Sequence, residues 1–253
     1  MSVTIEPATD SESGRTDLAL ELRDVRAAYG TITVLRGVDL AVPYGSVVAL
    51  LGPNGGGKST LLRVIAGQLA AAGGDVFVAG RRVNGAAPDE LARRGVCLIP
   101  EGKGIFPNLS VRENLWMVTH SGGSLKTIEE ATYGRFPRLG ERRRQLAGTL
   151  SGGEQQMLAM ARALTTNPAL LLLDELSMGL APIIVEQLYE IVAQVATEGV
   201  SILVVEQFAR VILGTADFVG IMLRGRITKF DTPAAVENEL STAYLGEERD
   251  GPR

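Results

Sequence analysis

The residue types that form disulfides and zinc sites are scarce in this sequence. Its 253 residues include one cysteine, Cys97, and one histidine, His120. A single cysteine excludes a disulfide within the chain, and this pair supplies too few ligands for a structural zinc site. Both facts are typical of a protein in a reducing cytosol. Cys97 lies in the apolar run 96–99, so we expect a packed, unreactive thiol; we expect His120 to be a solvated loop residue.

Long apolar runs and an excess of positive charge are also missing. The longest apolar runs, residues 47–51, 169–173 and 202–205, are far shorter than the roughly 18 residues that a membrane-spanning helix needs. The first residues lack the basic and apolar regions of a signal peptide. The net charge is -4, which leaves no broad basic field, so we expect no nucleic-acid partner. Any membrane role is expected to come through a partner protein.

The rest of the composition is typical of a globular protein. Hydrophobic residues make up 45% of the chain and charged residues 21%, and the length is enough to bury a sizeable core. Residues 1–16 are polar, which predicts a disordered tail. We expect residues 17–253 to form a single domain, with a core built from 17–100 and 166–246 and a helical insert over about 101–165.

Strand and helix patterns alternate along most of this domain. Strands are predicted at 18–22, 24–27, 34–42, 46–51, 75–80, 96–99, 169–173, 200–205, 218–223 and 226–230. Helices are predicted at 61–65, 87–94, 128–136, 138–147, 154–164, 183–198 and 208–213. Ser110 and Glu113 have the spacing of a capping box that begins a further helix. This alternation predicts an α/β fold with a mostly parallel sheet covered on both faces.

A glycine-rich stretch between a predicted strand and a predicted helix matches G-x-x-x-x-G-K-[ST]. It consists of Gly52, Pro53, Asn54, Gly55, Gly56, Gly57, Lys58, Ser59 and Thr60. Glycines let backbone N–H groups approach an anion closely, and the helix N-terminus adds partial positive charge. Lys58 is placed to reach terminal phosphates, and the Ser59 hydroxyl to ligate Mg²⁺. The stretch therefore predicts a nucleotide-binding phosphate loop.

Two acids end the very apolar run at 170–173. Parallel strands present functional side chains at their carboxyl ends, where Asp174 and Glu175 lie. Asp174 is placed to hold Mg²⁺, directly or through water. Glu175 lies one residue further along and is placed to polarise a water molecule for attack on the γ-phosphate.

A second glycine pair precedes the helix predicted at 154–164. Ser151 has the spacing to cap this helix, with Glu154 completing a capping box. Capping does not explain Gly152 and Gly153, which would expose backbone N–H groups at a helix N-terminus, where a phosphate binds. One chain thus carries two helix N-termini that are predicted to bind phosphate.

These motifs resemble those of the ATP-binding cassette (ABC) ATPases, and the resemblance covers about residues 18–246. It implies a P-loop NTPase (RecA-like) core with an N-terminal antiparallel β subdomain and an inserted α-helical subdomain. It also implies ATP and Mg²⁺ as cofactors, and a head-to-tail dimer in which residues 150–156 of one subunit close over ATP held by the phosphate loop of the other.

The resemblance also implies roles for individual residues. Ser151, Gly152, Gly153 and Gln155 would contact the γ-phosphate of ATP held by the partner cassette. Tyr29 would stack on adenine, although a tyrosine at a strand end is also common without that role. The loop 177–180 would cross the dimer axis.

Further segments are similar to one subgroup, the shorter ATP-binding subunit of branched-chain amino acid importers and their urea or amide relatives. These segments are residues 99–102, 148–158, 179–182, 205–207 and 243–246. The resemblance implies an ATPase on the cytoplasmic face of the plasma membrane, bound to permease subunits and acting indirectly with an extracytoplasmic solute-binding protein. The second cassette is either identical or related. The alternatives are import of urea, amides or other small molecules, and a non-transport or regulatory ABC ATPase.

Four positions depart from the usual pattern of the wider family. Gln207 replaces the common histidine; it can donate a hydrogen bond to the γ-phosphate but cannot take up a proton. Glu101 replaces a glutamine and is either an Mg²⁺-orienting residue or a surface acid. Gly56 replaces a residue with a methyl group, and Leu176 a proline, so we expect a looser phosphate loop and a more relaxed placement of Glu175.

Two other segments have open interpretations. Residues 104–109 include Ile105, Phe106 and Leu109 and are expected either to dock the membrane subunit or to join the core. Residues 142–144 are three arginines, which form either a solvated helix face or a contact with a partner or anionic headgroups.

Overall fold

The computed structural model describes residues 17–102, 104–119, 123–207 and 212–237. The predicted tail 1–16, His120, most of the helix predicted at 208–213 and the segment 243–246 lie outside the described residues. Within the described residues, no helix is long and apolar enough to span a bilayer.

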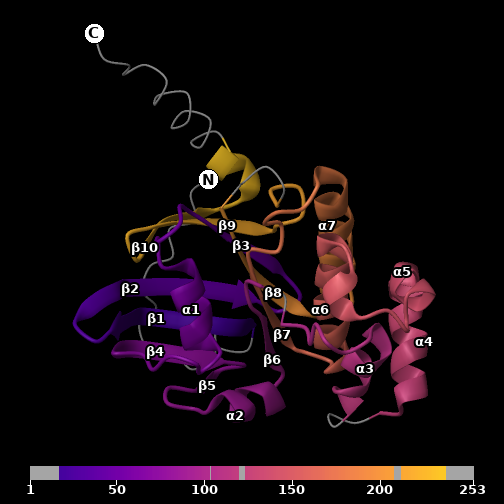
Figure 1. The fold of residues 1–253 in the computed structure, drawn as a ribbon. Coiled ribbons are helices and arrows are strands. Elements are labelled where there is room, and N and C mark those ends of the chain that lie inside the picture. Colours follow the sequence, from indigo (N-terminus) through magenta and orange to yellow (C-terminus); the bar gives the residue numbers. More distant parts are fainter. Residues whose placement is uncertain (1–16, 103, 120–122, 208–211, 238–253) are drawn as a thin grey trace.

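The strands form two sheets (Figure 1). The smaller sheet is antiparallel, has the order β2-β1-β4-β5, and is built from β1 (Leu18–Tyr29), β2 (Ile32–Pro43), β4 (Gly73–Val78) and β5 (Arg81–Arg82). The larger sheet has the order β10-β9-β3-β8-β7-β6. Its strands are β3 (Val47–Leu51), β6 (Val96–Ile99), β7 (Leu170–Asp174), β8 (Ser201–Glu206), β9 (Phe218–Leu223) and β10 (Arg226–Asp231). All its pairings are parallel except that of β9 with the edge strand β10.

The central strands of the larger sheet are buried on both faces. β3 and β7 are buried at every position, as expected for continuous apolar runs in a parallel sheet. Alternate residues point to opposite faces, so Val47 and Ala49 join one hydrophobic cluster while Val48 and Leu50 join the other. The predicted mostly parallel sheet, covered on both faces, is confirmed.

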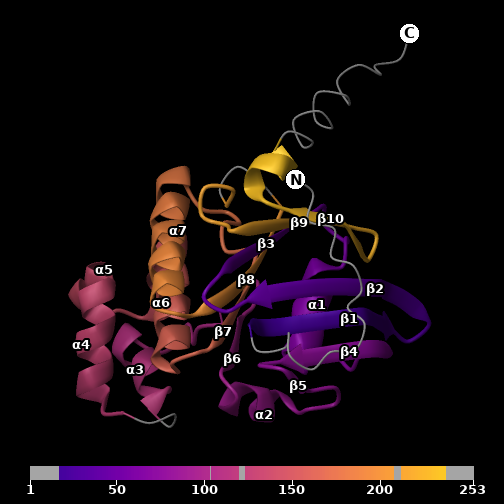
Figure 2. The ribbon, with the colours of Figure 1, turned by 180° about the vertical axis from the view of Figure 1, so that it is seen from behind.

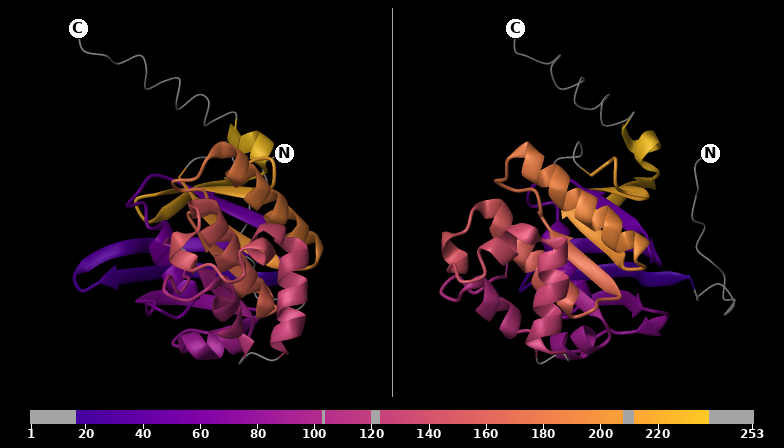
Figure 3. Two further views of the ribbon diagram at one scale, coloured as in Figure 1. Left: turned by 45° about the vertical axis from the view of Figure 1, so that its right-hand side comes forward. Right: turned by 90° about the vertical axis from the view of Figure 1, so that its right-hand side faces the viewer.

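Helices lie on both sides of this sheet (Figures 1 and 2). One cluster joins the sheet to α1 (Lys58–Ile65), the short α2 (Pro88–Arg93) and the smaller sheet. The other cluster joins it to the helices that Figure 3 brings forward. They are α3 (Val111–Trp116), α4 (Leu125–Arg135), α5 (Pro137–Glu141), α6 (Gly152–Thr165) and α7 (Pro182–Thr197).

The ends of these helices follow the local sequence, with one exception. Ser110 with Glu113, and Ser151 with Glu154, form complete capping boxes, as predicted. The helix predicted at 138–147 is wrong in its second half, because α5 ends at Glu141. The backbone N–H groups at the start of α3 donate to the carbonyl groups of Arg143 and Gln145 instead, so tertiary hydrogen bonds replace the helical ones.

Gly134 lies inside α4, and its replacement by alanine is expected to stabilise the fold. A Cβ built at Gly134 has no heavy atom within 4 Å. Because alanine has the higher helix propensity, we expect the free energy of unfolding to rise by about 0.5–1 kcal/mol. Urea unfolding followed by circular dichroism measures this change. The matched control is Gly140→Ala in α5, whose Cβ would lie 3.2 Å from Tyr133 and should gain less. A Gly134→Ala variant that is no more stable than the parent would contradict the prediction.

Cys97 lies in β6 and is partly buried. Burial raises the pKa of its thiol above the usual value, which keeps it protonated and a poor nucleophile at neutral pH. The environment of Cys97 therefore agrees with the predicted unreactive thiol.

Candidate active site

The phosphate loop connects the carboxyl end of β3 to the start of α1, and its glycines are needed for steric reasons. A Cβ on Gly52 would lie 2.2 Å from the backbone oxygen of Met222 in β9. Gly55 and Gly57 have φ angles of 77° and 104°, a conformation that favours glycine. Gly57 is the residue before α1, so the loop delivers its backbone to a helix N-terminus. Gly56 has no positive φ, and a Cβ there would lie 3.0 Å from the oxygen of Pro53.

Lys58 is buried, and its ammonium group folds back onto the loop that precedes it. Its Nζ donates to the carbonyl oxygens of Gly52 at 2.9 Å and Pro53 at 3.2 Å. The same Nζ lies 3.5 Å from the Glu175 carboxylate. The lysine thus neutralises the acid at the end of β7 and holds the loop around itself, at the place where terminal phosphates are expected.

Asp174 and Ser59 meet as the sequence predicts. The Ser59 hydroxyl donates to Asp174 Oδ1 at 2.9 Å, although the two residues are far apart in the chain. Burial is the main cause that raises the pKa of Asp174, and the charges of Glu175 and Glu101 raise it further. This carboxylate is held in a place where its negative charge is costly, a pattern typical of functional sites.

Glu175 follows β7 in a left-handed backbone conformation with a φ of 49°. Its backbone N–H donates to the oxygen of Val205 in β8 at 3.0 Å. The next residue, Leu176, is buried in the core on the helical side of the sheet. The relaxed placement expected from the missing proline is therefore offset by this packing and by a backbone hydrogen bond.

Lys58, Ser59 and Glu175 line one cavity of about 390 Å³, whereas Asp174 is not among its lining residues. Its lining combines the phosphate loop, the acid after β7 and the loop that follows it; the residues are Val34, Asn54, Gly55, Gly57, Lys58, Ser59, Thr60, Glu101, Glu175 and Met178. The sequence prediction missed Val34. The hairpin between β1 and β2 could have indicated Val34. Tyr29 pairs with Ile32 across the turn, which brings the start of β2 beside the end of β1.

Tyr29 ends β1 and is exposed. The Arg63 guanidinium of α1 donates to its hydroxyl at 3.2 Å, and this hydrogen bond is the main cause that lowers the pKa of Tyr29. Arg63, which the sequence prediction also missed, therefore fixes one end of the ring while the rest of the side chain is available for stacking.

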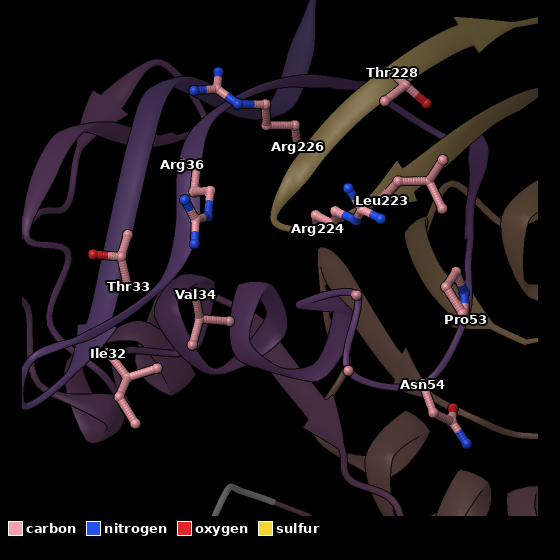
Figure 4. A pocket seen from close by; sticks show the side chains of 12 residues that line it. Ile32, Thr33, Val34, Arg36, Pro53, Asn54, Leu223, Arg224, Arg226 and Thr228 are labelled. Carbon is pink, nitrogen blue, oxygen red and sulfur yellow. The ribbon is translucent and has the colours of Figure 1, made fainter.

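A larger hollow of about 1030 Å³ lies beside this cavity and shares Val34, Asn54 and Gly55 with it (Figure 4). Arg36, Arg224 and Arg226 line it from β2 and the β9–β10 hairpin. Positive charge beside the phosphate loop favours the approach of an anion, even though the chain as a whole is acidic.

Gln207 follows β8 and lines a neighbouring cavity of about 630 Å³. This cavity shares Glu175 and Met178 with the one around the phosphate loop. Gln207 and Glu175 therefore border the same cavity.

The segment 151–155 lies at the N-terminus of α6 and lines neither of these cavities. Gly153 is packed closely, because a Cβ there would lie 2.4 Å from Ile184 of α7. The Gln155 amide donates to the carbonyl groups of Ala147 and Gly148. The Gln155 side chain therefore bonds to the segment that precedes α6, and it does not line the phosphate-loop cavity of its own chain.

Comparison with known proteins identifies this arrangement. The model of the ABC transporter family matches residues 35–177, more than half of the chain. The chain belongs to the ABC transporter family. The ABC cassette is 43% identical over 235 residues to the high-affinity branched-chain amino acid transport ATP-binding protein BraG of Pseudomonas aeruginosa, covering 90% of this chain and 99% of that one.

Two further relatives support the same assignment. The ABC cassette is 35% identical to the probable branched-chain amino acid transport ATP-binding protein LivF of Archaeoglobus fulgidus, covering 81% of this chain and 89% of that one. A crystal structure of an ATP-binding cassette of an ABC transporter in its ADP conformation superimposes with a TM-score of 0.81 at 26% identity, covering 91% of this chain and 97% of that one. The predicted resemblance, fold class and ATPase activity are confirmed.

Proposed function

We propose that this ABC ATPase powers the import of branched-chain amino acids. The observation that carries the proposal is the 43% identity to BraG, which extends over 90% of this chain and 99% of that protein. The transported substrate is expected to contact permease subunits and a solute-binding protein rather than this chain. Import of urea, amides or another small molecule is the alternative for the same ATPase.

The chain's own residues define the steps of hydrolysis. Adenine stacks on the Tyr29 ring, and backbone N–H groups of the phosphate loop hold the phosphates. Lys58 turns from the carbonyl groups of Gly52 and Pro53 toward the terminal phosphates. Glu175, freed from its ion pair with Lys58, accepts the proton of a water molecule that attacks the γ-phosphorus, while the bond from this phosphorus to the bridging oxygen breaks and ADP leaves.

The residues around Asp174 fit an Mg²⁺ ion. A hydroxyl and a carboxylate oxygen already lie side by side, and oxygen is the donor that Mg²⁺ prefers. The raised pKa of Asp174 marks a place where a cation would relieve unfavourable negative charge. No all-protein cage of three or more acidic, cysteine or histidine side chains occurs in the described part of the chain, as is usual where phosphates and water complete the coordination. Ser59 and Asp174, with Glu101 at the cavity wall, would hold the ion, which neutralises charge that develops on the phosphates.

Hydrolysis requires a second cassette on this proposal. Ser151, Gly152, Gly153 and Gln155 lie outside the cavity of their own chain, so the N-terminus of α6 is available to the ATP of a partner. The partner is a second copy or a related cassette. Residues 177–180, which follow Glu175, would meet the equivalent loop of the partner.

The segment 104–109 is proposed to contact the permease subunits. Phe106 is exposed, and the guanidinium carbon of Arg162 lies 4.7 Å from the centre of its ring. The Asn114 side chain is fully buried and holds this segment through hydrogen bonds to Phe106, Leu109 and Ser110. A rigid loop with an exposed aromatic tip suits a protein contact. The chain would then lie on the cytoplasmic face of the plasma membrane.

Gln207 is expected to act by donating a hydrogen bond and not by titrating. Its amide has no pKa in the physiological range, so the pH dependence of kcat should lack a histidine-like transition attributable to this position. Gln207→Ala should lower kcat at least about tenfold, because a hydrogen bond to the transferred phosphate is lost. Steady-state hydrolysis from pH 5.5 to 9 measures both effects. Unchanged hydrolysis by Gln207→Ala would remove this residue from the mechanism.

The proposed function is tested by measuring Mg²⁺-dependent ATP hydrolysis of the purified chain over a range of protein concentrations. A competent dimer should give a rate that rises more steeply than linearly, and Glu175→Gln should abolish hydrolysis while an ATP-bound dimer accumulates by mass. Hydrolysis that appears only after co-expression with a related cassette would identify a heterodimer. ATP binding without hydrolysis in either case would contradict the proposal and indicate a regulatory cassette.

Substrate identity needs a separate measurement. The chain is co-expressed with its permease subunits, and the complex is placed in vesicles with the solute-binding protein. Uptake of labelled leucine is then compared with uptake of labelled urea. ATP-dependent uptake of leucine supports the proposal, whereas uptake of urea alone would select the alternative.

A further inference from the structure

Glu206, the last residue of β8, is an acid inside the protein. Only 1% of the residue is exposed. It directly precedes Gln207, yet none of the hydrolysis steps described above uses it. A buried carboxylate is costly unless hydrogen bonds satisfy its oxygens. The hydrogen bonds that compensate for its burial therefore indicate what this acid does at the edge of the active site.

Two of its hydrogen bonds come from the loop that follows Glu175. The backbone N–H of Ser177 donates to Oε1 at 2.9 Å, and the Ser177 hydroxyl donates to Oε2 at 2.7 Å. Both oxygens of Glu206 are therefore committed to one residue of this loop. A loop held at a backbone and a side-chain group together has little freedom to change its path.

A third hydrogen bond ties the same carboxylate to α7. The Tyr189 hydroxyl donates to Oε1 at 2.6 Å. Burial and the Glu206 carboxylate raise the pKa of Tyr189 well above its usual value, so the tyrosine keeps its proton and stays a donor at neutral pH. The helix thereby fixes the orientation of the carboxylate that holds the loop.

The end of β8 also holds Glu175 itself. The Glu175 N–H donates to the oxygen of Val205, the residue before Glu206. Glu175, Ser177, Glu206 and Gln207 all line the same cavity. Residues 205–207 thus hold Glu175 through Val205 and include Gln207, and these are the two side chains proposed to face the γ-phosphate.

We propose that Glu206 is a positioning residue for ATP hydrolysis, holding the loop 175–180 and Gln207 in one arrangement through its hydrogen bonds to Ser177 and Tyr189. This inference rests on the proposed ATPase cycle. A misplacement of about 1 Å at a reacting group can lower a rate about 100-fold. The loop is also expected to meet the partner cassette. Glu206 therefore links the position of the Glu175 side chain to the contact between the two cassettes.

The test compares Glu206→Gln, Ser177→Ala and the double variant. Glutamine keeps the shape of the side chain but presents an N–H₂ group to a donor of Ser177, so one hydrogen bond is lost and the loop shifts. We expect kcat to fall about 10–100-fold in Glu206→Gln. The KM for ATP should change less than about threefold, because the phosphate loop is untouched. The double variant should be no slower than Glu206→Gln, since both changes break the same contact.

The matched control is Glu190→Gln, an exposed glutamate next to Tyr189 on α7. It changes the same chemical group outside the network and should leave kcat as in the parent. A folded Glu206→Gln variant with an unchanged kcat, or with its whole defect in KM, would show that Glu206 only contributes to stability and would overturn the proposal. Effects of Ser177→Ala and Glu206→Gln that multiply in the double variant would do the same.

Amide hydrogen exchange without nucleotide separates this inference from the proposed function. The Ser177 amide should exchange at least about tenfold faster in Glu206→Gln than in the parent, because its acceptor is weakened. If Glu206→Gln exchanged faster than a parent protein that does not hydrolyse ATP, the ATPase cycle would be contradicted but the contact of Glu206 with the loop would be supported. Unchanged protection of Ser177 would refute the contact, whatever the parent hydrolyses.

Discussion

Asp174→Asn is expected to stabilise the nucleotide-free protein while lowering ATP hydrolysis about 10–100-fold, the loss typical when a group that supports a metal is removed. The hydrogen bond from Ser59 can still be accepted by the asparagine oxygen. The negative charge, which burial and two neighbouring acids make unfavourable, is gone. We expect the free energy of unfolding to rise by about 0.5–2 kcal/mol at pH 7, as is common where a functional site carries unfavourable charge.

The gain in stability should depend on pH in a defined direction. The pKa of Asp174 is raised in the folded protein, so the stability present below the unfolded-state pKa is lost as the pH rises through the folded-state value. The gain in the free energy of unfolding from Asp174→Asn should therefore be largest at neutral pH. It should vanish below pH 3.8, the ordinary pKa of an aspartate, because the acid is then protonated in both the folded and the unfolded state. Urea unfolding at several pH values measures it.

The matched control is Asp89→Asn in α2, an exposed acid paired with Arg93. Its effect on stability should stay within about 0.5 kcal/mol, as for other surface ion pairs. If Asp174→Asn destabilised the nucleotide-free protein at neutral pH, the unfavourable charge inferred for this site would be wrong.

Gly52→Ala should be the most destabilising single change in the phosphate loop. The new Cβ would lie 2.2 Å from the Met222 oxygen, a backbone atom of a paired strand that cannot move aside alone. Overpacking of this kind costs about 3 kcal/mol, and the displaced loop should bind ATP at least about tenfold more weakly. Thermal unfolding and titration with a fluorescent ATP analogue measure the two effects.

Gly55→Ala separates steric contact from backbone strain. Gly55 has a φ of 77°, but a Cβ there meets no heavy atom within 4 Å. Alanine should therefore cost only about 1–2 kcal/mol, the penalty of a left-handed residue. If Gly55→Ala proved as damaging as Gly52→Ala, the contact with Met222 would not be the reason that Gly52 is needed.

Local motifs made the phosphate loop and the cap of α6 predictable from the sequence. A strand, a run of glycines and a helix occur within a few residues of one another, so no distant contact is needed to recognise them. The meeting of Ser59 with Asp174 was also predictable, because Ser59 follows β3 and Asp174 ends β7, and the carboxyl ends of these parallel strands lie on one edge of the sheet.

Contacts set by strand order could not be predicted in the same way. β8 lies between β3 and β7, and this order alone brings Glu206 beside Ser177. The sequence marks Glu206 only as part of a subgroup motif and does not show its partners. The second half of the predicted helix 138–147 failed for a related reason, since the start of α3 supplied hydrogen-bond donors that no local pattern reveals.

The two hydrophobic clusters include alternate residues of the same strands, so within the described residues the larger sheet lies between them. Leu171 and Leu173 face the helices that border the proposed permease contact, whereas Leu170 and Leu172 face the side of α1. Because close-packed interiors transmit strain, a tilt of the helical layer would be expected to displace β7 and β8, after which Glu175 and Gln207 follow.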